Sequence, residues 1–143
     1  MNAVRTYLIY SAAAVLVGGL GFWFWPADKP GAAATATTVN VPELTGLSAF
    51  GKAAFDKVCA ACHGANGAGT DKGPPFVHDI YNPGHHPDEA FFRAARLGVP
   101  QHHWPYGDMP PQPEVGEYEV RAIVQYVRAL QRANGIIYRP HQM

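Results

Sequence analysis

The feature that most restricts what this chain can fold into is the run Cys59-Ala-Ala-Cys62-His63, which contains both cysteines of the sequence. Two cysteines cannot build a disulfide framework, and at this spacing they would close only a very small loop. A C-x-x-C pair can be a redox dithiol or half of a zinc site, and one followed directly by His can attach a c-type haem. The rest of the sequence has to decide among these three chemistries.

Haem attachment is the interpretation that uses all three residues. A zinc site needs a second pair of ligands at short spacing, and neither His85-His86 nor His102-His103 has the usual separation. A thioredoxin-like dithiol needs a βαβ context, which the sequence lacks. Two thiols on one helical turn can add to the two vinyl groups of a haem while His63 binds the iron. The sequence therefore predicts one covalent haem c, held by Cys59 and Cys62, with His63 as an axial ligand.

The first part of the chain predicts a membrane anchor. Residues 6–27 form a run of 22 residues without charge, about 33 Å long as a helix and sufficient to cross a bilayer. Four aromatic residues at 22–25 suit a membrane–water interface, and Arg5 on the short side favours a cytoplasmic N-terminus. We therefore expect an uncleaved transmembrane helix within residues 1–27, with the remainder extracytoplasmic. A cleaved signal peptide, using the small residues at 31–36, is the alternative.

Two further segments follow the anchor. Residues 28–46 are rich in Ala, Thr, Pro and Gly and predict a flexible linker. Residues 47–143 predict an all-α haem domain, with no strand pattern and with long loops at 64–86 and 99–116. The equal numbers of basic and acidic residues, 11 each, give no indication of a nucleic-acid partner.

Three helices are expected in this domain. The first begins at Ser48 as N-cap and leads to the cysteines, with Phe50 and Phe55 as candidate core residues. The second has Pro87 at its first position and ends at Gly98. The third starts at Glu117 and ends at Asn134-Gly135. Its apolar stripe consists of Val120, Ile123, Val124, Val127 and Leu130.

Met109 is the expected second axial ligand of the iron. It is the only methionine besides Met1 and Met143, and it lies in a loop stiffened by four prolines at 105, 110, 111 and 113. A thioether ligand favours the ferrous state, so His/Met ligation predicts a comparatively high reduction potential. Trp104 and Tyr106 are candidates for walls of the haem pocket or for donors to the haem propionates.

Residues 47–133 resemble a class I c-type cytochrome, the mitochondrial-type fold in its bacterial form. Gly51 and Phe55 stand where that family has the glycine and aromatic residue of its N-terminal helix. Ile123 and Tyr126 match the apolar and aromatic residues of the C-terminal helix that crosses it. The resemblance implies a cytochrome c fold, three main helices around a covalent haem, with Gly51 allowing the two helices to approach closely.

The loops carry the same resemblance. Gly73-Pro-Pro-Phe76 resembles the family's Gly-Pro-x-Leu, which implies that the carbonyl of Pro74 accepts the N–H of the His63 imidazole and orients it. Gly107-Asp-Met-Pro-Pro111 resembles the loop that supplies the methionine ligand. The implied function is single-electron transfer at the bacterial inner membrane, by a tethered carrier or by a fixed subunit of an oxidoreductase complex. The expected partners are a quinol-oxidising complex, a terminal oxidase or a photosynthetic reaction centre.

The loops are also rich in histidine, at positions 78, 85, 86, 102 and 103. These residues can be polar surface groups or donors to the haem propionates. His102 or His103 could instead replace Met109 on the iron, or the two His-His pairs could hold a second metal such as copper. A haem-based sensor with a labile sixth ligand, and a peroxidase-like enzyme, are the alternative functions.

Overall fold

The computed structural model of the protein describes residues 38–140. Its helices are α2 (Gly46–Val58), α3 (Ala60–His63), α4 (Asp88–Leu97) and α5 (Glu117–Ala133), with 3-10 turns η1 (Ala65–Gly67) and η2 (Asp79–Tyr81). Within this part of the chain there is no strand, only an isolated antiparallel bridge between Val99 and Met109. The expected all-α character of this domain is confirmed for the described residues.

The predicted transmembrane helix at residues 6–27 lies outside the described residues. Among residues 38–140, none of the helices combines the length and the apolar character needed to cross a membrane.

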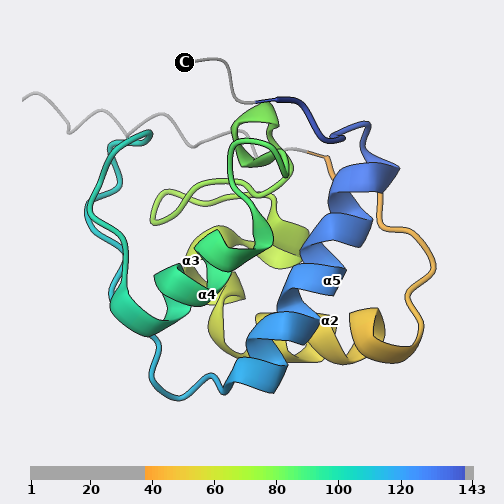
Figure 1. The fold of residues 1–143 in the computed structure, drawn as a ribbon, viewed down its shortest axis with the longest axis horizontal. Helices are drawn as coiled ribbons and strands as arrows, with labels where there is room; N and C mark the ends of the chain where they lie inside the picture. The colour runs from red at the N-terminus through yellow and green to blue at the C-terminus, as the bar shows by residue number, and fades with distance from the viewer. Residues whose placement is uncertain (1–37, 141–143) are drawn as a thin grey trace, which may run out of the picture. The chain divides into compact units, whose positions relative to one another are not determined.

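The fold is organised by the crossing of α2 and α5 (Figure 1). At the crossing, a Cβ atom placed on Gly51 would lie 1.9 Å from the carbonyl oxygen of Ala122, so the two backbones are in direct contact. The close approach expected from the resemblance is confirmed. Around the crossing, Phe55 packs edge-on against Tyr126, with ring centroids 5.4 Å apart. The buried cluster consists of Ala54, Phe55, Val77, Ile123, Tyr126, Val127, Leu130 and Ile136.

The start of α2 differs from the sequence expectation in two respects. The N-cap is Thr45 and not Ser48; Ser48 is the third residue of the helix, and its hydroxyl accepts a hydrogen bond from the Thr45 N–H at 3.3 Å. Phe50 is 45 % exposed and is not a core residue. The helical period places Phe50 beside the buried face, where its ring lies 5.5 Å from that of the exposed Tyr118.

The end of the expected linker is part of the domain. Asn40 and Asn134 are paired, with the Asn40 N–H donating to Asn134 Oδ1 at 2.9 Å and Asn134 Nδ2 donating to the Asn40 carbonyl at 2.8 Å. Val39 and Leu44 pack against the buried cluster. Residues 38–45 therefore dock on the C-terminal end of α5, which corrects the expectation of a flexible tether up to residue 46.

The second expected helix is α4, with Pro87 as its N-cap and not as its first helical residue. The segment after α4 makes a long excursion away from the helices before it returns to α5 (Figure 1). Its two runs are joined at the Val99–Met109 bridge, where each N–H donates to the other residue's carbonyl at 2.9 Å. This excursion carries His102, His103, Trp104, Tyr106 and Met109.

Candidate functional site

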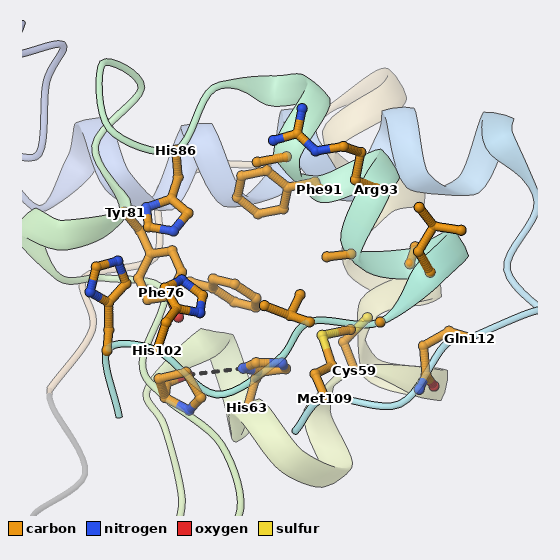
Figure 2. Close-up of a pocket in the computed structure, with 18 of the residues that line it drawn as sticks. Cys59, His63, Phe76, Tyr81, His86, Phe91, Arg93, His102, Met109 and Gln112 are labelled. Carbon is orange, nitrogen blue, oxygen red and sulfur yellow. Dashed lines mark hydrogen bonds between the residues drawn. The ribbon is translucent and has the colours of Figure 1, made fainter. Parts of the chain in front are cut away.

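One large cavity lies among α4, the excursion and the C-x-x-C-H segment. Its volume is about 800 Å³, and Figure 2 shows a selection of the residues around it. Of the residues singled out in the sequence, it is lined by Cys59, His63, Pro74, Trp104, Tyr106 and Met109, together with His85, His86, His102 and His103. Its apolar wall includes Phe76, Phe91, Ala94, Leu97, Val99, Val115, Val120 and Ile123.

His63 is the last residue of α3 and is 7 % exposed. Its Nδ1 lies 2.9 Å from the carbonyl oxygen of Pro74, which can only accept, so Nδ1 carries the proton and donates. Burial lowers the pKa of His63, and the Pro74 hydrogen bond opposes this in part. The ring is stacked on Phe76, with centroids 4.3 Å apart. His63 is therefore held as a neutral imidazole with the Nε2 lone pair left for a ligand bond.

The two cysteines differ in their surroundings. Cys59 is half-buried and lines the cavity; burial raises the pKa of its thiol to about 11, with smaller contributions from Glu114 and Cys62. Cys62 is exposed and does not line the cavity. The chain turns directly after His63, where Gly64 has φ of +76°. This turn lets residues 73–76 lie beside the C-x-x-C-H segment.

Met109 is fixed on the cavity wall through its backbone. Besides the bridge to Val99, its carbonyl lies so near Gly98 that a Cβ on that glycine would approach it to 2.5 Å. Gly98 has φ of +73°, so glycine is required here both for the turn and for the space. Figure 2 shows the Met109 side chain on the same side of the cavity as Cys59. The excursion thus returns Met109 to the end of α4 in a fixed register.

Trp104 and Tyr106 lie near each other on the cavity wall, with ring centroids 6.2 Å apart. The Trp104 Nε1 atom is buried and makes no hydrogen bond of good geometry, although it is near enough to the Tyr81 hydroxyl to lower the pKa of that group. Burial is the larger effect on Tyr81 and raises its pKa to about 12. A buried N–H without a good acceptor suits the carboxylate of a bound group.

Sequence reasoning placed Arg128 near the C-terminal end of the third helix but missed its role in shaping the site. Its side chain is 7 % exposed, pairs with Asp88 at 2.8 Å, and donates to the carbonyl oxygens of Tyr81 at 3.0 Å and His86 at 2.5 Å. These bonds fasten the loop before α4 to α5. The available signal was its position four residues after Val124, on the apolar face of the helix.

The cavity fits a haem. Its volume is in the range of cofactor pockets, its walls are mainly apolar, and a neutral imidazole and a thioether both line it. Arg93 and Trp104 add donors for the propionates. The two thiols needed for covalent attachment lie one helical turn apart, directly before the imidazole.

Comparison with known proteins agrees with this site. The family model described as Cytochrome c matches residues 48–131, which is more than half of the chain. No curated protein and no solved structure gives a significant match.

Proposed function

The chain belongs to the cytochrome c family and carries covalently attached haem c, and from this premise we propose that it is a membrane-anchored single-electron carrier with His63 and Met109 as axial ligands. A haem c supplies a one-electron Fe(II)/Fe(III) couple when bound. The observation that best supports the ligand assignment is the hydrogen bond between His63 Nδ1 and the Pro74 carbonyl. It fixes the imidazole tautomer that leaves Nε2 for the iron.

The protein's own residues then perform four tasks. Cys59 and Cys62 hold the group covalently, and Pro74 orients the His63 ring. The Val99–Met109 bridge fixes the backbone that presents the thioether, which favours a ligand that stays in place when the charge of the iron changes. The apolar wall, with Phe91, Val115 and Ile123 among its members, excludes water, which raises the reduction potential.

The membrane part of the proposal is supported by the uncharged run at residues 6–27 and its aromatic end. We place the haem domain on the periplasmic side of a bacterial inner membrane. Its electron donors and acceptors are membrane complexes such as a quinol-oxidising complex, a terminal oxidase or a photosynthetic reaction centre. A fixed place in one such complex is a variant of the same function.

The visible absorption spectrum of the full-length protein, oxidised and then reduced with carbon monoxide added, tests this function. A carrier with His63/Met109 ligation shows a weak far-red thioether–iron band in the ferric state and does not respond to carbon monoxide. A missing far-red band with a ready carbon monoxide shift would instead indicate a labile sixth ligand and would favour a haem-based sensor. The anchor is tested by separating membranes from the soluble extract. We expect the protein in the membrane fraction.

A further inference from the structure

Three imidazoles from two distant loop segments meet at one place in the cavity wall. One ring nitrogen each from His85, His86 and His103 lies within 4.8 Å of the others. The Nε2 atoms of His85 and His103 are 3.1 Å apart, within hydrogen-bond distance, so in the metal-free protein one ring can donate to the other. Two imidazole nitrogens bound to one zinc ion at about 2.0–2.1 Å in tetrahedral geometry would be separated by about 3.3 Å. The spacing of this pair is therefore already close to that of two ligands of one ion.

The His85-His86 dipeptide is held rigidly by its surroundings. Both backbone N–H groups donate to the Asn82 carbonyl, at 3.0 and 2.9 Å, and Arg128 binds the carbonyl of His86. The side chain of His86 is also fixed, because its Nδ1 lies 2.7 Å from the Ile80 carbonyl. That bond leaves Nε2 as the nitrogen available for a metal. An imidazole oriented through a backbone carbonyl in this way is the usual arrangement of a metal-binding histidine.

One member of the cluster lies away from the residues expected to hold the haem: Figure 2 shows His86, and the neighbouring His102, across the cavity from Cys59 and Met109. Because all of these residues line one cavity, the competing role for the histidines is hydrogen bonding to the haem propionates. Three converging nitrogens, one pair of them 3.1 Å apart, match an ion better than a carboxylate, whose oxygens would accept from separate donors.

We propose that His85, His86 and His103 bind one divalent transition-metal ion of the class that prefers imidazole, Zn²⁺ or Cu²⁺, beside the haem. Three protein ligands leave a coordination position open for water or for a fourth group. His102 is the nearest further imidazole, with its ring centroid 4.3 Å from that of His103. Cu²⁺ should bind more tightly than Zn²⁺ at such a site.

The test is equilibrium dialysis of the full-length, haem-loaded protein against Zn²⁺, after a chelator has removed bound metal. We expect one zinc ion per chain and its displacement by Cu²⁺. His103→Gln should weaken zinc binding by at least about tenfold, since even the loss of a group that only orients a ligand costs this much. His78→Asn is the matched control, because an Asn side chain can still accept the Ile80 N–H that His78 Nδ1 accepts at 3.2 Å. It should leave zinc binding unchanged.

Haem absorbance per chain, measured for each variant, shows whether the domain has folded. If His103→Gln fails to load haem, His85→Gln provides the second variant. Wild-type protein that retains no stoichiometric zinc, or a correctly loaded His103→Gln variant with wild-type zinc affinity, would overturn the proposal. If the wild type binds no zinc and His103→Gln changes the reduction potential, the proposal is also overturned, and the role of these imidazoles is hydrogen bonding to the haem propionates. None of these three outcomes alters the spectroscopic test of His63/Met109 ligation.

Discussion

Gly51 of α2 lies directly against the carbonyl of Ala122 in α5, at a place where any side chain would collide with backbone. The neighbours of this contact are the buried Phe55, Ile123 and Tyr126, so the crossing also sets the position of the aromatic core. The C-x-x-C-H segment continues directly from α2. The position of His63 therefore depends on a residue without a side chain twelve positions earlier.

Replacing this glycine with alanine should destabilise the protein although alanine is the better helix former. Overpacking a core lowers the free energy of unfolding by about 1–3 kcal/mol, and by more where the added atom meets backbone. The higher helix propensity of alanine offsets about 1 kcal/mol of this loss. We expect a net loss of about 2 kcal/mol for Gly51→Ala, measured by guanidinium unfolding of the haem-loaded protein.

Ala53→Gly is the matched control, because Ala53 lies on the exposed face of the same helix. It should lose only the propensity contribution, about 1 kcal/mol. A Gly51→Ala protein more stable than the wild type would mean that the backbones are not in contact.

Arg128 provides a second test of how the site is held. Arg128→Met keeps much of the volume but removes the donors to the carbonyls of Tyr81 and His86. Breaking a buried ion pair costs about 3–5 kcal/mol, and since Asp88 is half exposed and can rehydrate, we expect about 3 kcal/mol. Thermal or guanidinium unfolding measures the loss.

The control for Arg128 is Arg121→Met. Arg121 and its partner Glu117 are both largely exposed, with 3.7 Å between the charged groups. Such a pair contributes less than about 0.5 kcal/mol. Equal effects of the two substitutions would contradict the anchoring role of Arg128.

The sequence predicted those parts of the fold that depend on local signals. The apolar period of α5, the proline and acidic residues at the start of α4, and the glycine after it each act over one or two turns. The resemblance to the family predicted the contact between His63 and Pro74, eleven residues apart. The structure contains this hydrogen bond. The ligand role of Met109 stays a prediction.

The parts that were not predicted depend on contacts between distant segments. The docking of residues 38–45 relies on the Asn40–Asn134 pair, whose members are 94 positions apart. Phe50 is exposed because α5 meets the face of α2 that holds Gly51 and Phe55, and the sequence of α2 alone does not show how far that contact extends around the helix. The convergence of His85 and His103, 18 positions apart, requires the path of the excursion after α4.

Tyr126 couples α5 to the turn after the C-x-x-C-H segment. Its hydroxyl donates to Asn66 Oδ1 at 3.0 Å, and Asn66 has φ of +55°, a conformation that needs support. Tyr126→Phe should cost about 1 kcal/mol at neutral pH. Tyr118→Phe, at an exposed position, should cost much less.

The difference in the free energy of unfolding between the wild type and Tyr126→Phe should depend on pH. Burial, with Asp56 as the smaller cause, raises the pKa of Tyr126 from 10.0 to about 12. The folded state therefore favours the neutral phenol; this stability is complete below pH 10 and is lost as the pH rises from 10 towards 12. The advantage of the wild type over Tyr126→Phe should shrink in that interval. An advantage that stays constant from pH 8 to 12 would contradict the raised pKa.

The axial ligand is the decisive prediction for the electron-transfer function. Met109→Ala should abolish the far-red band, allow carbon monoxide to bind the ferrous iron, and lower the potential by on the order of 0.2 V, within the range of about 0.8 V that axial ligands control. His102→Gln and His103→Gln are the controls, because these are the other side chains of the excursion that could bind iron. Both should keep the far-red band. The outcome that contradicts this prediction has two parts. Met109→Ala keeps the wild-type reduction potential and binds no carbon monoxide, whereas one of the histidine variants changes the potential and binds carbon monoxide. The sixth ligand would then be that imidazole and not the Met109 thioether.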